Sequence, residues 1–327
     1  MGKKIRNQEL STGNHKKAGE EAYHIPVLLR ETVEGLNIQP EGVYVDCTFG
    51  GGGHSNAILQ KLGEKGRLIA FDQDADAAAN VPDDERVIFV PQNFRHLKRF
   101  LRLHGIAGVD GILADLGVSS HQFDEAERGF STRFDAALDM RMDRRQQKTA
   151  FDLVQNYGEQ QLHKMFEQYG EVTNAKTLAK TIVAVRSQVS IKTIDAFKNA
   201  LRGVVKGNPN KYFAQVFQAL RIEVNEEMES LKEMLVQAKD VLNSGGRLAV
   251  ITFHSIEDRL VKNFFRQGSF DEKEENPFIN VETNSGLKII TKKPVVAGTE
   301  ELKINPRSRS AKLRVAERNA EGRKLKS

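Results

Sequence analysis

The sequence predicts an α/β protein built on a doubly wound, mostly parallel sheet that a helical insertion interrupts. Between residues 43 and 115 short apolar runs alternate with helical stretches, which is typical of βαβ units. From about residue 126 to 221 the pattern is helical, and strand-like runs return at residue 247. We therefore expect a sheet domain formed by residues 23–125 and 222–318, with the insertion at 126–221.

Length and composition place the chain among ordinary globular proteins. Its 327 residues exceed the roughly 100–200 of a single domain, and 39% hydrophobic with 28% charged residues argue against wholesale disorder. No apolar run approaches the ~18 residues of a membrane span, and residues 1–22 are polar, without a secretory signal. The single cysteine, Cys47, excludes an internal disulfide. We expect a cytoplasmic protein with a flexible N-terminus and no membrane contact.

The individual elements follow from periodicity. Helical faces are formed by Ala57, Ile58, Leu59 and Leu62, by residues 177–185 and 194–201, and by Phe213, Val216, Phe217 and Leu220 at i, i+3, i+4 and i+7. A last amphipathic helix, with Met228, Leu231, Leu235, Ala238 and Leu242, is expected to end at Gly245-Gly246. The predicted strands are residues 43–46, 67–72, 87–90, 111–115, 247–252, 287–291 and 312–316.

A glycine-rich turn follows the first predicted strand. Gly50 to Gly53 open a helix, where backbone can approach a ligand, and Asp72 ends the second strand, placed to accept hydrogen bonds from ribose hydroxyls. NAD enzymes and methyltransferases share this combination of a glycine-rich turn and an acid at the end of the second strand. The dinucleotide fingerprint G-x-G-x-x-G fails, because its third glycine would fall on Ser55 or Asn56. The spacing disfavours an NAD oxidoreductase; a turn that serves packing alone stays an alternative.

A second candidate site follows the fourth predicted strand, where Asp115 precedes Ser119 and Ser120. Ligands of doubly wound sheets bind outside the carboxyl ends of the strands. We therefore expect Asp115 to face the same crevice as Asp46, Gly52 and Asp72. The alternative is an aspartate that merely starts a turn.

Seven motifs in order, from His24 to about Arg318, resemble the RsmH (MraW) family. Members of that family methylate the exocyclic amine of a cytidine in small-subunit ribosomal RNA. The matching segments are His24-Ile25-Pro26-Val27-Leu28, Asp46-Cys47-Thr48 with Gly52-Gly53-His54-Ser55, Asp115-Leu116-Gly117-Val118-Ser119-Ser120, Arg128-Gly129-Phe130-Ser131 with Leu138-Asp139-Met140-Arg141-Met142-Asp143, Gln218-Ala219-Leu220-Arg221-Ile222, Phe253-His254-Ser255 through Asp258-Arg259, and Asn305-Pro306-Arg307-Ser308-Arg309-Ser310.

The resemblance implies a Rossmann-like, S-adenosylmethionine-dependent methyltransferase that acts on ribosomal RNA within the small subunit, with the insertion recognising substrate. The sequence departs from the family where His121 replaces a usual proline and Ala136-Ala137 replace Gly-Pro. Another RNA as substrate and a catalytically idle RNA-binding module remain alternatives, and no pattern indicates an oligomeric state. Carried over by position, the methyl-donor contacts are Gly52, Gly53, His54, Asp72, Phe94, Asp115 and Gln122.

The residue types favour methylation of nitrogen over carbon. Attack from ring carbon 5 needs a cysteine thiolate, and Cys47 lies beside the cofactor strand, where a small packed residue is expected. A nitrogen nucleophile needs acceptors that orient the amine toward the methyl group. Asp115 is the first candidate for that role, with Ser119 and Ser120 as candidates for positioning the base.

The segment after the fifth predicted strand supplies substrate candidates, His254 and Arg259. A capping box explains the same segment without a substrate, with Ser255 as N-cap and Asp258 three residues on. We expect no metal site, because the eight histidines are scattered without ligand spacing.

The C-terminal segment is strongly basic. Residues 307–327 hold eight Lys or Arg against two Glu, a net of +6, so that the rest of the chain carries −1. Such an arm suits a polyanion, although a merely solvated tail fits the charge equally well. Arg307 and Arg309 are therefore candidates for contacting RNA, with residues 319–327 as a mobile basic tail.

Overall fold

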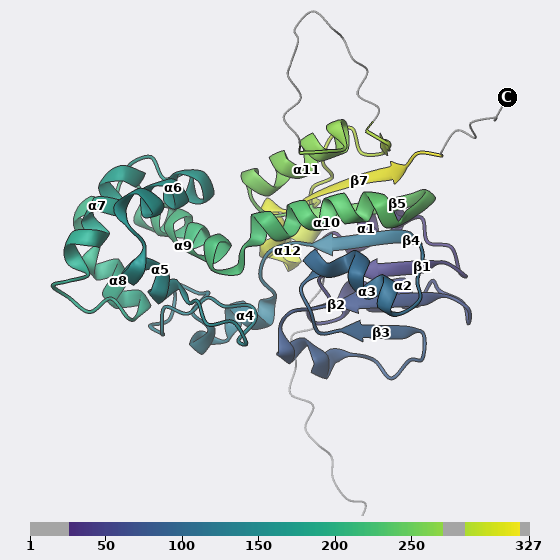
Figure 1. Ribbon diagram of the computed structural model, residues 1–327, viewed down its shortest axis with the longest axis horizontal. Helices are drawn as coiled ribbons and strands as arrows, with labels where there is room; N and C mark the ends of the chain where they lie inside the picture. Colours follow the sequence, from purple (N-terminus) through teal and green to yellow (C-terminus); the bar gives the residue numbers. More distant parts are fainter. Residues whose placement is uncertain (1–25, 271–284, 321–327) are drawn as a thin grey trace, which may run out of the picture.

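The computed structural model describes residues 26–270 and 285–320. Within them, seven strands form one sheet in the order β3-β2-β1-β4-β5-β7-β6 (Figure 1). Strands β1 to β5 are parallel, and β7 runs antiparallel to both β5 and β6. The expected mostly parallel α/β sheet is confirmed. The strands are β1 (Val43–Asp46), β2 (Arg67–Phe71), β3 (Val87–Val90), β4 (Val109–Asp115), β5 (Leu242–Thr252), β6 (Leu287–Ile289) and β7 (Lys312–Arg318).

Strand register gathers acidic residues at one edge of the sheet. Asp46 pairs with Leu113 of β4 and with Ala70 of β2, so Asp72 and Asp115 follow at neighbouring strand ends. The chain order reverses between β1 and β4, because β2 and β3 lie on one side and β4 and β5 on the other. A reversal of this kind opens a crevice at the carboxyl ends of the strands.

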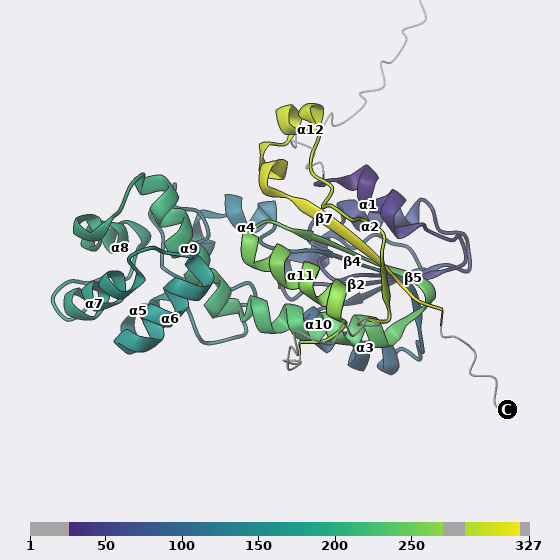
Figure 2. The ribbon, with the colours of Figure 1, turned by 90° about the horizontal axis from the view of Figure 1, so that it is seen from above.

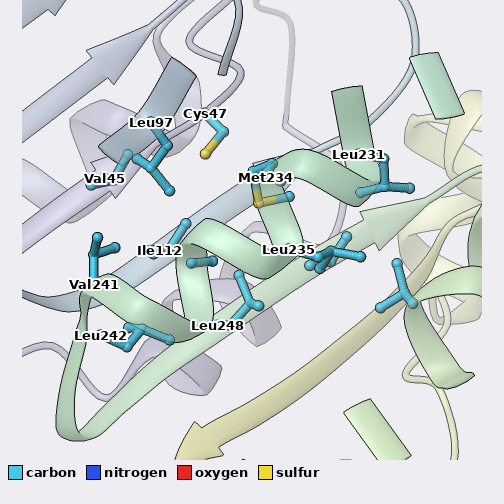
Figure 3. Packing of buried hydrophobic residues seen from close by; sticks show 14 of the residues in the cluster. Val45, Cys47, Leu97, Ile112, Leu231, Met234, Leu235, Val241, Leu242 and Leu248 are labelled. Carbon is cyan, nitrogen blue, oxygen red and sulfur yellow. The ribbon is translucent and has the colours of Figure 1, made fainter. Parts of the chain in front are cut away.

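Two apolar layers cover the sheet. Alternate residues of each strand face opposite sides, so Val45 packs toward helices α3, α10 and α11, whereas Tyr44 packs toward α1 and α2 (Figure 2). Figure 3 shows the first layer, a single apolar cluster that includes Leu231 and Leu235 of α10 together with Ile112 and Leu248 of the sheet. The helices involved are α1 (Leu29–Leu36), α2 (Gly53–Leu59), α3 (Leu97–Leu103), α10 (Glu227–Val241) and α11 (Ser255–Gln267).

A separate apolar cluster lies in the chain between β4 and α10. Its residues run from Phe130 to Val224, and its helices stand apart from the sheet (Figures 1 and 2). The long helix α9 continues four residues past the expected boundary at 221 and leads into α10. The elements of this part are α4 (Ser120–Asp124), α5 (Ala150–Asn156), α6 (Glu159–Gly170), α7 (Ala175–Val185), α8 (Ile194–Ala200) and α9 (Pro209–Asn225), with short 3-10 turns η3 (Ala126–Arg128) and η4 (Arg202–Val204).

Local sequence signals explain where these helices begin. The side chain of Asn208 accepts hydrogen bonds from the amides of Asn210 and Lys211, and Pro209 occupies the first helical position of α9. Thr149 and Asp152 form a capping box at α5. The remaining short elements are η1 (Ala75–Asn80), η2 (Phe94–His96), α12 (Thr299–Ile304) and η5 (Pro306–Ser310).

Two expected boundaries are wrong. Helix α10 ends at Val241, not at the Gly245-Gly246 pair, because the chain turns directly into β5 and Gly245 adopts a left-handed φ of +80° within that strand. The N-cap of α11 is His254, not Ser255, and its capping partner is Glu257. Across residues 26–270 and 285–320, no helix has the combined length and apolarity that crossing a membrane requires.

Candidate methyl-donor cleft

A cleft of about 1170 Å³ opens at the carboxyl ends of β1, β2 and β4, with the start of the insertion forming its far wall. Of the predicted site residues, Gly52, His254, Arg259 and Arg309 do not line it. The predicted residues that the structure brings together there are Gly53, His54, Asp72, Phe94, Asp115, Ser119, Ser120, Gln122 and Arg307.

The glycine turn exposes backbone to the cleft. Gly50 and Gly52 have φ of +51° and +77°, a conformation that side chains disfavour. At Gly53 a Cβ would lie 2.2 Å from Pro26 Cγ, so close packing excludes a side chain. A Cβ on Gly51 would meet nothing within 4 Å, so this residue faces open space. Gly52 thus shapes the turn, while its neighbours border the cleft.

Asp72 is tied to the turn. Its carboxylate accepts the amide N–H of Gly50 at 2.7 Å and that of Asp74 at 2.8 Å, one on each oxygen. Burial raises the pKa of Asp72 to about 6, against the lowering effect of these two amides. Each oxygen keeps a free lone pair, so the carboxylate can still accept a ligand hydroxyl.

The ends of β1 and β4 are linked through Thr48. Its hydroxyl accepts the amide N–H of Asp115 at 2.7 Å, while its own amide donates to Asp46 at 3.0 Å. Asp46 is fully buried and also accepts the Ser55 hydroxyl at 2.8 Å. Burial raises the pKa of Asp46, a change that the nearby His54 counteracts. These bonds fix the backbone at the floor of the cleft.

Asp115 has an unsatisfied acceptor. Its side chain is 23% exposed overall, yet Oδ1 is buried and finds no hydrogen-bond partner among the described residues. Its Oδ2 lies 3.6 Å from Nδ1 of His54, whose Nε2 is 3.0 Å from the Val27 carbonyl oxygen. Burial, then the charges of Asp46 and Glu257, raise the pKa of Asp115 well above its ordinary value. An incoming amine or cation would satisfy this carboxylate.

The loop after β4 is held by its own side chains. Ser119 caps α4 by accepting the amide N–H of Gln122 at 3.1 Å, and the Gln122 amide group donates to Asp74 at 2.7 Å. Ser120 starts the helix at the cleft wall. Gln122 is buried, so its side chain serves to join this loop to the end of β2.

Arg128 joins the insertion to the same strand end. Its guanidinium lies 2.7 Å from Asp74 and 2.9 Å from Asp76, and it also donates to the carbonyl oxygens of Arg141 and Met142. The side chain is 2% exposed. Asn225, at the end of α9, holds the same loop by accepting the amide N–H of Met142 at 2.7 Å.

A further acidic group lies beside the cleft. Glu257 is buried and accepts the amide N–H of Phe253 at 2.8 Å, and its Oε1 lies 3.1 Å from Nε2 of His254. Burial alone would raise the pKa of Glu257, but hydrogen bonding and charge from His254 lower it. Within the described part of the chain, Glu227, His254 and Glu257 form one group with potential metal-ligand atoms within 4.8 Å. Arg221 already binds both oxygens of Glu227, at 2.8 and 3.0 Å.

The other predicted substrate residues have protein partners or lie outside the cleft. Arg259 pairs with Glu171 of the insertion at 3.0 Å, and Arg307 pairs with Asp124 at 2.7 Å. Arg309 is exposed. Arg307 also lies over the Phe123 ring, 5.8 Å from its centroid. Of the predicted substrate residues His254, Arg259, Arg307 and Arg309, only Arg307 lines the cleft.

Sequence reasoning missed two groups, the Arg128 pairs and Glu257. Both fall inside motifs that carried the family resemblance, but without a stated role. Arg128 and Asp74 are 54 residues apart, and only the fold brings them together. Asp258 has the spacing of a capping acid relative to Ser255, but it pairs with Arg314 at 2.7 Å, and Glu257 is the capping acid of α11.

Comparisons with known proteins agree with the resemblance. A family model described as "MraW methylase family" matches residues 21–319. Ribosomal RNA small subunit methyltransferase H of Flavobacterium johnsoniae is 54% identical over 298 residues, which cover 90% of this chain and 98% of the relative. The protein of the same name from Bacteroides thetaiotaomicron is 53% identical over 301 residues, 91% of this chain and 98% of the relative.

Solved structures align over most of the chain but loosely. An rRNA methylase from Streptococcus thermophilus covers 89% of this chain and 94% of its own, at a TM-score of 0.38 and 12% identity. Family membership therefore depends on the family model and the sequence relatives.

Proposed function

Because this chain belongs to the MraW methylase family, we propose that it transfers a methyl group from S-adenosylmethionine to the exocyclic amine of a cytidine in small-subunit ribosomal RNA. The observation that carries the proposal is the cleft, in which an open glycine turn and the carboxylates of Asp72 and Asp115 line one space. A target base must leave its stack to enter such a cleft.

The residues present fit the methyl donor. The free lone pairs of Asp72 accept the ribose hydroxyls, and Phe94, half-buried at the cleft wall, packs on the adenine. Gly53, His54 and Gln122 complete this wall. The carboxylates of Asp115 and Glu257 line the inner end of the cleft, and in their charged forms they attract a positively charged donor.

S-adenosylmethionine supplies a methyl carbon bonded to a positively charged sulfur. In the proposed reaction the cytidine amine forms a bond to that carbon, the carbon–sulfur bond breaks, and the electron pair stays on sulfur. The Asp115 carboxylate at the cleft accepts one N–H of the amine and so orients the nitrogen. The amine loses its second proton to water, which Ser119 and Ser120 help to place at the cleft wall.

Cys47 takes no part in this scheme. Its side chain is buried at 2% exposure, and burial raises the pKa of its thiol well above the ordinary value. A thiol held in that state is a poor nucleophile, so covalent activation of a pyrimidine ring is disfavoured. Attack by the amine nitrogen needs no such group.

The insertion is the part that recognises substrate in this proposal. Its helices form their own apolar cluster, and its first segment builds one wall of the cleft. RNA bound to the insertion would therefore present a nucleotide to the donor. We assign residues 23–125 and 222–318 to the methyltransferase domain and 126–221 to the insertion, in a cytoplasmic enzyme that acts on the small ribosomal subunit.

The product identifies the function. Small subunits or their ribosomal RNA, prepared from cells that lack this protein, are incubated with it and with labelled S-adenosylmethionine. The RNA is digested to nucleosides, which are separated by chromatography against standards because N4-methylcytidine and 5-methylcytidine have the same mass. The label should appear in N4-methylcytidine. Label in 5-methylcytidine, or none in RNA, would overturn the proposal. Thermal stabilisation by S-adenosylhomocysteine and not by NAD would separate the methyltransferase from the oxidoreductase alternative.

A further inference from the structure

Positive charge is concentrated in two segments of the chain. Residues 173–211 hold eight Lys or Arg and one acid, Asp195, a net of +7, and residues 307–327 carry +6. Since the whole chain is +5, all other residues together carry −8. A local excess of this size is the electrostatic footprint of a nucleic-acid surface.

The two segments differ in what their cations contact. In the C-terminal segment, Arg307 pairs with Asp124, and both Lys312 and Arg314 pair with Asp258. In residues 173–211, by contrast, six of the eight cations are exposed and make no ion pair or side-chain hydrogen bond with any described residue. These cations are Lys176, Lys180, Lys192, Arg202, Lys206 and Lys211.

Several of these cations gather around the short turn η4. The Asn174 side chain donates to the Val204 carbonyl oxygen at 2.8 Å, which brings the start of α7, with Lys176, to the segment that holds Lys206. A hollow of about 410 Å³ between α8 and the start of α9 is lined by both Lys198 and Arg202. We call Lys176, Lys198, Arg202 and Lys206 the η4 surface.

Stability does not account for this surface. Lys176 lies in the first turn of α7, where the helix dipole disfavours a positive charge. Only one acid, Asp195, lines the hollow, and it already pairs with Lys198 at 3.3 Å. The mutual repulsion of the remaining cations costs free energy that an anionic partner would recover.

An exposed aromatic residue lies beside the cations. The ammonium of Lys198 donates to the carbonyl oxygen of Thr132 at 3.3 Å, which places the loop containing Phe134 along α8. Phe134 is 47% exposed. Unpaired RNA bases stack on exposed aromatic rings flanked by cations. From this loop the chain continues to Met142 and Arg144, which line the donor cleft.

We propose that the η4 surface and Phe134 form the RNA-docking surface of the insertion. The cations contact phosphates, Phe134 stacks on an unpaired base, and the chain segment up to Arg144 leads from this surface to the cleft. The inference rests on the proposed function, since it takes ribosomal RNA as the partner. It places the main RNA contact on the insertion and not on the C-terminal strand.

A triple variant, Lys176→Gln with Arg202→Gln and Lys206→Gln, tests the proposal. Each phosphate contact contributes roughly 0.7–0.9 to the slope of log affinity against log salt. Binding of a naked small-subunit ribosomal RNA transcript should weaken, and the slope should flatten by about 2–3 units. The melting temperature and the affinity for S-adenosylhomocysteine should not change. Phe134→Ala should weaken binding while leaving the salt slope as it is.

The matched control removes three exposed cations from the other end of the sheet: Lys61→Gln, Lys65→Gln and Arg102→Gln. This control variant loses the same three positive charges as the η4 variant. Its slope of log RNA affinity against log salt should equal that of the wild type. A wild-type slope in the η4 variant, or equal losses in both variants, would overturn the inference. A loss seen with assembled subunits but not with naked RNA would also overturn it, in favour of a protein contact. If the wild type methylates no RNA, the proposed function fails. That outcome is measured separately from the salt dependence of RNA binding, so the two failures can be told apart.

Discussion

The guanidinium of Arg128 and the carboxylate of Asp74 form a buried ion pair at 2.7 Å, with side chains 2% and 8% exposed. Arg128 is the last residue of η3, at the start of the insertion, and Asp74 lies two residues beyond Asp72, whose carboxylate accepts the amide N–H of Asp74. The ion pair therefore connects the proposed ribose site to the part of the chain proposed to recognise RNA.

Arg128→Met should destabilise the protein and disorder the cleft wall. Removing one partner of a buried pair leaves the other charge without compensation, at a cost of about 3–5 kcal/mol. Chemical denaturation measures this cost. Arg128→Lys should recover part of the stability but lose the contacts to the carbonyl oxygens of Arg141 and Met142.

Arg145→Met is the control for this prediction. Arg145 pairs with Asp143 at 2.8 Å, but its side chain is 53% exposed, so its removal should cost less than about 1 kcal/mol. Equal losses from the two methionine variants would show that burial of the Arg128 pair is unimportant.

Asp72→Ala should weaken binding of S-adenosylmethionine by about 1.5–3 kcal/mol, the scale of a hydrogen bond to a charged group. Titration calorimetry measures the affinity, and a thermal melt establishes that the variant is folded. Asp83→Ala, which removes an exposed carboxylate outside the cleft lining, should bind as the wild type does. Unchanged affinity in a folded Asp72→Ala protein would remove this residue from the ribose role.

Donor binding should depend on pH. In the free protein, burial raises the pKa of Asp72 to about 6 and that of Asp115 well above its ordinary value. Ribose hydroxyls and a positive sulfur both favour the charged carboxylates, so binding should release protons and weaken as the pH falls below about 6. Calorimetry at pH 6 in buffers of different ionisation enthalpy measures the release. No proton release, or tighter binding in acid, would contradict this arrangement.

The raised pKa of Asp72 also affects stability. Between about pH 4 and 6 the native protein holds this proton more tightly than the unfolded chain, so this group's contribution to stability falls as the pH rises through that window. Donor affinity should move in the opposite direction. The site thus combines lower stability with better binding at neutral pH.

The C-terminal tail gives a separate prediction. Arg323, Lys324 and Lys326 lie outside the described residues. A protein truncated after Ala320 lacks these three cations but retains β7. If they contact phosphates, the truncation flattens the salt slope of RNA binding by up to about 2–3 units and leaves donor affinity unchanged. A full-length slope in the truncated protein would show that the tail is no RNA arm.

Much of the fold and the cofactor end of the cleft could be predicted from the sequence. Short apolar runs and a glycine turn are local signals, so the strands and the positions of Asp72 and Asp115 follow from short windows. The sequence favours Ser255 as the N-cap of α11, because Ser is a commoner N-cap than His. In the structure the imidazole of His254 is the N-cap, with Glu257 as its capping partner.

Contacts between distant segments could not be predicted in this way. Arg314 belongs to the basic segment 307–327, but β7 lies beside β5 and brings its side chain to Asp258 of α11. Arg259 likewise meets Glu171, which is 88 residues away. Ion pairs of this kind depend on tertiary packing, which periodicity does not encode. Charge density in the insertion was visible in the sequence, but its exposure needed the structure.

The most direct test of the proposed chemistry is the single-turnover rate of methyl transfer in Asp115→Ala at saturating S-adenosylmethionine and ribosomal RNA. Saturation separates the catalytic role from donor binding, which is measured in parallel. Loss of the acceptor that orients the amine should slow N4-methylcytidine formation at least about tenfold, since each 1.4 kcal/mol of transition-state stabilisation is worth that factor. A wild-type rate in this variant would contradict the assignment of Asp115 to the reacting amine.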